Sequence, residues 1–399
     1  MKGGNSKVGG YLPALRDFIY LDSASVCPPL PGTLRAMQDY YERYPFNYRV
    51  GVWSSSVELT ELVDNIRKDI AEFIGASSEN QVAFTKNTTE AINLVALGMR
   101  WRKGDEVVLT TVEHQSNIIP WMKAAEDFGV VVKFAKADSS GIVHPVSVER
   151  LISKRTKLVS ITEVSNIYGS IQPVSAIQKI AEEHGVLLMT DAAQSAGRLR
   201  VDVAASDCTF SAFCGRKSLM GPQGTGFLYG KAEALEELSP LTVGSLAADV
   251  KSTKTFSYLD LPYRFEAGVI NTAGIVGLGA AVRSLAEIGI GNIRQKVVSL
   301  TRYLVERLKE IRGIEIYGPT DPELQAGILS WNMRRLSPDE IVSRLWKSRR
   351  IAVASGDQGS PLAIQPLHIT GVVRTSVHYF NSREDIDSLA TVLKSIRDR

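Results

Sequence analysis

The chain has 399 residues, which is long enough for two domains and a large buried core. Its 46 basic and 43 acidic residues leave a net charge of +3, too small to indicate a nucleic-acid or membrane partner. The three cysteines form no C-x-x-C pair, so we expect reduced thiols and no metal site. Because no signal-peptide pattern opens the chain and no apolar run is long enough to span a bilayer, we expect a cytoplasmic protein.

The chain is expected to begin with an N-terminal arm over residues 1–19. Residues 18–25 then enter the fold, and prolines at positions 28, 29 and 31 end that segment. Residues 55–74 have apolar side chains at helical spacing and stop at Gly75, a favourable residue for ending a helix. We therefore predict a helix over 55–74.

Residues 81–95 predict a short strand, a turn and a helix. The turn falls at Asn87, a residue type that tolerates positive φ, and the helix opens with the hydroxyls of Thr88 and Thr89. The free backbone N–H groups and hydroxyls of such a helix start would suit a phosphate group. Taken alone, the same pattern is typical of an ordinary helix cap.

From residue 106 onward, short strands alternate with helices. The predicted strands, at 106–110, 130–134, 157–162 and 186–191, are rich in Val, Ile and Leu and apolar on both faces. The predicted helices lie at 117–128, 145–152 and 174–184. This pattern is typical of a parallel sheet covered by helices, so we predict an α/β fold with ligands at the carboxyl ends of the strands.

Polar residues follow directly on several of these strands. His114 follows the strand 106–110, Asn166 follows 157–162, and Asp191 and Gln194 follow 186–191. A further strand, 208–213, approached from residues 201–203, is followed by Lys217. Because the carboxyl ends of parallel strands share one edge of a sheet, we expect these side chains to converge.

Lys217 lies in a glycine-rich stretch, 214–226, with glycines at 221, 224 and 226 that permit sharp turns. A lysine held there could be desolvated, with the lowered pKa that a Schiff-base lysine needs. Alternatively, it is a surface lysine beside a hairpin. A nucleotide-binding protein is disfavoured, because no glycine-rich phosphate motif follows the first strand.

The converging set has the chemistry that pyridoxal phosphate requires. Its aldehyde needs a lysine, its pyridine nitrogen a carboxylate, its phenolic oxygen amide donors and its phosphate a helix N-terminus. A ring such as that of His114 could stack on the cofactor. The residues therefore predict a pyridoxal-phosphate site.

The chain resembles the class V aminotransferase family of fold-type I pyridoxal-phosphate enzymes, in the branch of cysteine desulfurases, selenocysteine lyases and isopenicillin N epimerase-like proteins. The resemblance extends from about Tyr20 to the C-terminus. The motifs that support it lie at residues 20–24, 87–95, 113–121, 164–166, 191–195, 264–268 and 373–376.

The resemblance implies a role for each site residue. Lys217 would form the Schiff base, His114 would stack on the ring and Asp191 would pair with the pyridine nitrogen, these three being the catalytic residues. Arg374 would clamp the carboxylate of an amino-acid substrate, beside Ser25 and Asn166. The other residues expected to contact the cofactor are Asn87, Thr88, Thr89, Asn166, Gln194, Cys214 and Arg216.

The resemblance also implies a homodimer with two domains in each subunit. The large cofactor-binding domain would cover residues 20–270 and contain the mostly parallel sheet. The small α+β domain would cover 271–399 and pack with the N-terminal arm, 1–19. A sulfur-acceptor protein would be a possible partner.

The chain departs from the desulfurase pattern at four places. Arg216 and Cys214 stand where desulfurases have a histidine and a serine before the lysine, and Val269 replaces a threonine that reaches the partner subunit's phosphate. The loop after the strand 351–353 lacks the nucleophilic cysteine, since no cysteine follows Cys214, and Ala354 replaces an arginine.

These departures leave the reaction open among several outcomes. C–S or C–Se bond cleavage of a cysteine-type substrate comes first, either as β-elimination, which needs no enzyme nucleophile, or as desulfuration with an external thiol as the acceptor. Transamination and epimerisation are the alternatives within the family. A non-catalytic scaffold for a sulfur-transfer system is the alternative outside enzyme chemistry, and retention of the lysine, the carboxylate and the histidine disfavours it.

Overall fold

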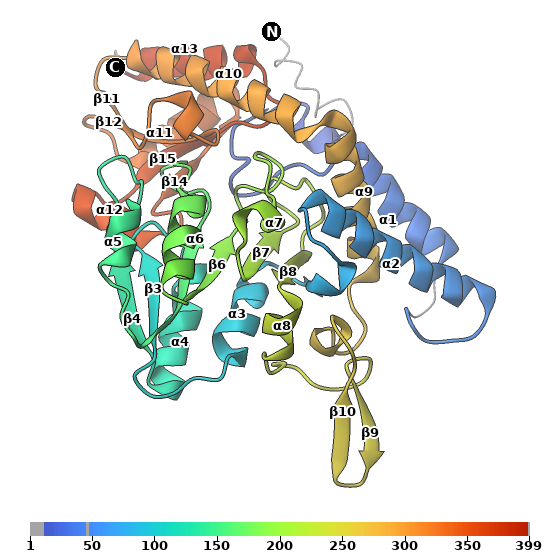
Figure 1. The fold of residues 1–399 in the computed structure, drawn as a ribbon. Coiled ribbons are helices and arrows are strands. Elements are labelled where there is room, and N and C mark those ends of the chain that lie inside the picture. Colours follow the sequence, from blue (N-terminus) through green and yellow to red (C-terminus); the bar gives the residue numbers. More distant parts are fainter. Residues whose placement is uncertain (1–11, 45–47, 398–399) are drawn as a thin grey trace.

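The structure, a computed structural model, describes residues 12–44 and 48–397, and a seven-stranded sheet with the order β2-β8-β7-β6-β5-β3-β4 lies at its centre (Figure 1). The strands are β2 (Val82–Thr85), β3 (Glu106–Thr110), β4 (Val131–Ala135), β5 (Thr156–Thr162), β6 (Leu187–Asp191), β7 (Phe210–Cys214) and β8 (Gly226–Gly230). From β7 to β4 every neighbouring pair is parallel, whereas β8 is antiparallel to both of its neighbours. The predicted α/β class with a mostly parallel sheet is confirmed.

Both faces of this sheet are buried, which explains why its strands are apolar on both sides. Val107 and Leu109 pack in one hydrophobic cluster with Trp121, while Val108 packs in a second cluster with Ile177. Helices α3 (Thr88–Gly98), α4 (Ile119–Phe128) and α8 (Ala232–Glu236) contribute to the first cluster. Helices α2 (Ser54–Phe73), α5 (Pro145–Glu149), α6 (Val174–Glu183), α7 (Val203–Ser206) and α9 (Thr272–Ile288) contribute to the second, and α1 (Pro31–Arg43) packs against it.

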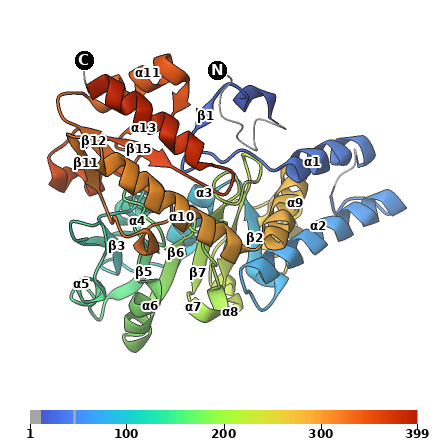
Figure 2. The ribbon, with the colours of Figure 1, turned by 90° about the horizontal axis from the view of Figure 1, so that it is seen from above.

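A second, antiparallel sheet lies in the last third of the chain, with its own core around Trp331. Its strands are β11 (Ile314–Tyr317), β12 (Ile328–Met333), β15 (Val372–Ser376) and β14 (Ala354–Gly356), and the helices of this region are α10 (Ile290–Lys309), α11 (Pro338–Arg349), α12 (Pro361–Ile364) and α13 (Arg383–Arg397). Near the N-terminus, β1 (Ile19–Tyr20) pairs in parallel with β13 (Ile351–Ala352), and Figure 2 shows β1 close to α13. Residues from the two ends of the chain therefore lie together.

Helix α9 links the two regions. Although it follows residue 270, where we predict the large domain to end, its side chains Leu278 and Val282 belong to the core of the large sheet, and it packs on α1 and α2. The division of the chain at residue 270 stays a prediction. No single helix in the described part of the chain is long and apolar enough to cross a bilayer, and α9 and α10 meet that test only together, as a pair bent by 76°.

A hairpin of β9 (Ala248–Ser252) and β10 (Thr255–Tyr258) projects from the body of the molecule (Figure 1). Two large apolar side chains on it face solvent, since Val250 is 83% and Phe256 is 54% exposed. The short 3-10 turns of the chain are η1 (Pro13–Leu15), η2 (Glu79–Gln81), η3 (Gln115–Asn117), η4 (Tyr263–Phe265), η5 (Pro322–Leu324) and η6 (Gln365–Leu367).

The predicted elements need four local corrections. The helix predicted from 117 begins at Ile119, behind the turn η3, and the helix predicted over 145–152 ends at Glu149. Residues 201–203 form no strand, because Asp202 caps the short helix α7. Asn87 has a φ of −176°, which is extended rather than positive, because it serves as a side-chain N-cap for α3. Most of the predicted N-terminal arm lies outside the described residues, which begin at residue 12.

Candidate active site

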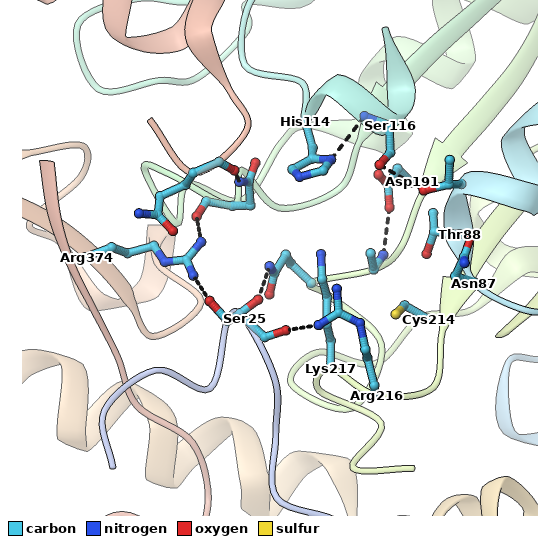
Figure 3. A pocket seen from close by; sticks show the side chains of 16 residues that line it. Ser25, Asn87, Thr88, His114, Ser116, Asp191, Cys214, Arg216, Lys217 and Arg374 are labelled. Atoms are coloured by element: carbon cyan, nitrogen blue, oxygen red, sulfur yellow. Dashed lines mark hydrogen bonds between the residues drawn. The ribbon is translucent and has the colours of Figure 1, made fainter. Parts of the chain in front are cut away.

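A pocket of about 270 Å³ lies at the carboxyl ends of the parallel strands, and the twelve side chains predicted from sequence all line it (Figure 3). They are Ser25, Asn87, Thr88, Thr89, His114, Asn166, Asp191, Gln194, Cys214, Arg216, Lys217 and Arg374. The structure thus brings the set together, while the role of each residue stays a prediction. Ala24, Ser116, Ala193 and Gln358 also line the pocket and were missed.

Lys217 lies in the tight turn that follows β7. Gly215 makes the turn possible, because a Cβ there would lie 2.1 Å from Thr225 Oγ1. Burial lowers the pKa of Lys217, and the nearby Cys214 and Asp191 act in the opposite direction. A lowered pKa favours the unprotonated form of the amine, which is the form that attack on an aldehyde requires.

Asp191 is the last residue of β6, and its Oδ1 accepts a hydrogen bond from Ala193 N at 2.8 Å. Burial raises the pKa of this carboxyl, and the charge of Lys217 works against that rise. A cationic ring nitrogen beside Asp191 would favour its ionised form further. The position therefore suits the partner of a pyridinium.

His114 follows β3 and is held as a neutral ring. Burial, followed by the charge of Lys217, lowers its pKa to about 4. Ser116 N donates to His114 Nδ1 at 3.1 Å, so the proton of the neutral ring is on Nε2. Nε2 faces Gly359, where a Cβ would lie only 2.7 Å away.

One end of the pocket is the N-terminus of α3. Asn87 Oδ1 accepts from Glu90 N at 2.9 Å, and Thr89 Oγ1 donates to Ser116 Oγ at 2.9 Å. Thr88 Oγ1 is buried and makes no hydrogen bond within the described part of the chain. An orphaned buried hydroxyl at a helix N-terminus fits a phosphate group.

The two amides of the set have different surroundings. Gln194 Nε2 donates to Ala24 O at 2.8 Å, and its Oε1 is buried with no partner among the described residues. Asn166 Nδ2 donates to Gln358 O at 2.9 Å, and Asn166 Oδ1 accepts from Ser360 Oγ at 2.8 Å. Asn166 therefore holds the loop 356–360 over the pocket.

Arg374 lies on β15, at the opposite side of the pocket from α3 (Figure 3). Its Nη2 donates to Ser25 Oγ at 2.6 Å and to Asp22 Oδ1 at 3.1 Å, and its Nη1 donates to Asn166 O at 3.0 Å. Its Nε is buried without a partner in the described residues. A planar guanidinium held in this way suits recognition of a carboxylate.

A buried network beneath His114 was also missed. Glu113 accepts hydrogen bonds from Thr110 Oγ1 at 2.5 Å, Thr162 N at 3.0 Å and Asn117 Nδ2 at 2.7 Å. Burial raises the pKa of Glu113 to about 8. The sequence signal available for this network was a carboxylic residue directly before His114, but the three hydrogen-bond partners of Glu113 come from different elements.

The residues of the pocket fit pyridoxal phosphate. The orphaned hydroxyl of Thr88 lies at the α3 end, and the orphaned Gln194 Oε1 lies elsewhere in the pocket. Lys217 and Asp191 supply the amine and the carboxylate that the aldehyde and the ring nitrogen need. In the described residues, no group of three or more His, Cys, Asp and Glu side chains could hold a metal ion.

A mostly parallel α/β fold with a buried lysine at a strand end, opposite a carboxylate and a helix N-terminus, defines the class of fold-type I pyridoxal-phosphate enzymes. The class V aminotransferase family model matches residues 19–389, and the chain belongs to this family. The family expected from the sequence is confirmed.

Named relatives are similar over nearly the whole chain. A probable cysteine desulfurase of Methanothermobacter thermautotrophicus is 42% identical, with 96% of each chain covered. The solved structure of a cysteine desulfurase from Thermococcus onnurineus has a TM-score of 0.94 at 34% identity and covers 99% of each chain. A cystine C–S lyase structure, with a TM-score of 0.85 at 22% identity over 96% of this chain and 98% of that one, shows the shared fold.

Proposed function

We propose that this chain is a pyridoxal-phosphate-dependent enzyme that cleaves the C–S bond of a cysteine-type amino acid by β-elimination, without using an enzyme thiol to accept sulfur. The named relatives support the substrate class, since those described as desulfurases are 34–42% identical to this chain. The pocket supports the cofactor, because its lysine, carboxylate and helix N-terminus match the groups that the cofactor presents.

The observation that favours elimination over desulfuration is the loop 356–360. Residue 359 is a glycine with a φ of +71°, and a Cβ there would lie 2.7 Å from His114 Nε2. Gly359 O accepts from Gln115 N at 2.7 Å, and Asn166 holds Gln358. The loop is therefore fixed against His114 and offers no thiol to take sulfur from the substrate.

The three cysteines elsewhere do not replace that thiol. All are free and buried, and burial raises the pKa of Cys27 and of Cys208 to about 12. Cys214 lines the pocket, at the end near Asn87 and Thr88 and away from Arg374 (Figure 3). A thiol at that end would face the cofactor's phosphate rather than the sulfur of a substrate held by Arg374.

Bound pyridoxal phosphate would supply an aldehyde that condenses with amines and a ring that accepts the electron pair released at the substrate α-carbon. Lys217 Nζ, buried and with a lowered pKa, would take the α-proton. Arg374 would bind the carboxylate, and Asp191 would keep the ring nitrogen protonated.

The proposed reaction balances without an added oxidant or reductant. The α-proton moves to Lys217, the C–S bond breaks with its electron pair on sulfur, and sulfide leaves with a proton. Water then converts the remaining amino-acid fragment to pyruvate and ammonia. Desulfuration to alanine would instead need a thiol to accept sulfur.

We also infer a homodimer, because apolar side chains remain exposed on and near the β9–β10 hairpin. Val250 is 83% and Val269 is 66% exposed, and a second chain packed on this side would remove their apolar surface from water. We also infer a cytoplasmic location, which is supported by the three cysteines being free thiols in the structure. A sulfur-acceptor protein could still collect the released sulfide.

The test is a product assay on the purified holoenzyme with L-cysteine and with L-cystine. Pyruvate, sulfide and ammonia in equal amounts from L-cysteine are expected. Sulfide with alanine would contradict the elimination, and restoration of the spectrum by an α-keto acid after L-alanine would indicate an aminotransferase. A protein that stays colourless with added cofactor would be a scaffold.

A further inference from the structure

The segment 22–27 crosses one side of the pocket and is held by the segments that follow β6 and β7 and by β15 of the small sheet. After β6, Gln194 Nε2 donates to Ala24 O at 2.8 Å, and after β7 the carbonyl of Arg216 accepts from Cys27 N at 2.9 Å. From the small sheet, Ser376 Oγ accepts from Ala24 N at 2.9 Å. The segment therefore couples the lysine-bearing turn to β15.

Ser25 is the point where two arginines meet this segment (Figure 3). Arg216 Nη1 donates to the Ser25 carbonyl at 2.5 Å, and Arg374 Nη2 donates to the Ser25 hydroxyl at 2.6 Å. The same hydroxyl donates to Asp22 Oδ1 at 2.9 Å. One residue thus receives a charged donor from the turn before Lys217 and another from β15.

These contacts determine the orientation of the Arg374 guanidinium. Its Nη2 is shared between Ser25 and Asp22, and its Nη1 is held by Asn166 O, so the unpartnered Nε is fixed by planarity. Hydrogen bonds with a charged donor are short and roughly twice as strong as neutral ones. A shift of Ser25 would therefore turn the plane that meets a carboxylate.

We propose that Arg216 is a positioning residue for the substrate carboxylate, which acts through Ser25 on Arg374. The proposal rests on the proposed function, because it takes an amino acid as the ligand. Arg216 is the only one of the pocket's two arginines that touches the Ser25 backbone among the described contacts. Loss of its guanidinium leaves the carbonyl of Ser25 without its charged donor and frees the segment at that point.

The first experiment separates the carboxylate from the rest of the ligand. L-Alanine and L-alaninamide are titrated into the holoenzyme, and their dissociation constants are read from the visible spectrum of the cofactor. Because neither probe has sulfur, the titration does not depend on C–S cleavage. In Arg216→Ala we expect affinity for L-alanine to fall about tenfold while affinity for L-alaninamide stays unchanged, which is the size of one charged hydrogen bond.

Two further variants accompany this measurement. Arg216→Lys keeps a positive donor and is expected to recover most of the affinity for L-alanine. Arg200→Ala is the matched control, because Arg200 is an exposed arginine that pairs with Asp202 at 3.2 Å away from the pocket. An equal loss of L-alanine affinity in Arg200→Ala, or no recovery of that affinity in Arg216→Lys, would contradict the proposal.

A double-mutant cycle tests the route through Ser25. Ser25→Ala removes the hydroxyl that meets Arg374 but keeps the carbonyl that meets Arg216. If Arg216 acts through that hydroxyl, Arg216→Ala should cause no further loss of L-alanine affinity in the Ser25→Ala background. Additive losses would overturn the proposed route.

The remaining outcomes separate this proposal from the proposed function. If Arg216→Ala weakens pyridoxal phosphate but leaves L-alanine affinity intact, the arginine serves as a counter-charge for the phosphate and the proposal fails. If the wild type forms pyruvate from L-cysteine yet binds L-alanine and its amide equally, the clamp fails while C–S cleavage stands. If the wild type binds L-alanine more tightly than L-alaninamide but forms no pyruvate from L-cysteine, the carboxylate clamp stands and the elimination fails.

Discussion

The two ends of the pocket are built in different ways. The end that would hold the cofactor is made by β6, the turn after β7 and the start of α3, so Asp191, Lys217 and Thr88 lie on or directly after elements of the large sheet and its covering helices. The end that would hold the substrate is made by residues 22–25, the loop 356–360 and β15, which join through side-chain hydrogen bonds. A sheet fixes the positions of its strand ends, whereas residues in loops can be replaced with little effect on the rest of the fold. This difference fits a chain that has the residues predicted to bind the cofactor while its loop 356–360 has no cysteine.

The largest effect is expected at the cofactor end. Lys217→Ala should remove the visible absorbance of the bound cofactor and lower turnover by about a thousandfold or more, because the variant lacks the proposed general base. Lys231→Ala is the control, since Lys231 pairs with Asp207 at the surface at 2.6 Å. If Lys217→Ala keeps the wild-type spectrum, Lys217 does not bind the cofactor, and the assignment of this end of the pocket to the cofactor is wrong.

The pH dependence of stability should show that His114 is held as a neutral ring in the folded protein. Its pKa is about 4 in the folded protein against an ordinary value of 6.5, so the unfolded chain binds the proton first. The free energy of unfolding therefore falls by about 3 kcal/mol as the pH falls from 6.5 to 4. Urea unfolding of the cofactor-free protein should show this loss reduced in His114→Gln and unchanged in His144→Gln, an exposed histidine.

The loop end is tested at Gly359. Gly359→Ala forces a Cβ onto His114 at a φ of +71°, and we expect the free energy of unfolding to fall by about 1–3 kcal/mol together with turnover. Gly185→Ala is the matched control, because Gly185 also has a positive φ, +65°, and no atom lies within 4 Å of its added Cβ. Equal effects of the two substitutions would mean that the loop is not fixed against the histidine.

The smallest effect is expected from the thiols. A variant with Cys27→Ala, Cys208→Ala and Cys214→Ala should keep turnover near the wild-type value per folded, cofactor-loaded molecule, because the elimination needs no enzyme sulfur. The measurement is pyruvate formation, normalised by cofactor content. Loss of sulfide release with the cofactor retained would instead point to a persulfide on one of these cysteines.

Sequence patterns predicted the large sheet well because its strands are buried on both faces. The strand 106–110 was predicted with the observed bounds, and the rule that ligands lie at carboxyl ends selected Lys217, Asp191 and His114. The family resemblance added Arg374, which no local pattern distinguishes from other arginines.

What sequence could not predict depends on contacts between distant segments. The bond from Asn166 to Gln358 joins residues 192 positions apart, and the packing of Gly359 on His114 depends on it. The extended backbone at Asn87 was also missed, because residue preference alone does not separate a cap from a left-handed turn. Such details are set by tertiary packing.

The contact between Asp22 and Arg374 has a consequence for synthesis, because the two residues are 352 positions apart. A ribosome releases the N-terminal segment long before β15 is synthesised. The nascent chain can therefore form the large sheet and the turn that carries Lys217 while β15 and Arg374 are still missing. Cofactor could then be captured by a half-built pocket. The ability to discriminate among amino acids would arise only when the last strand is in place.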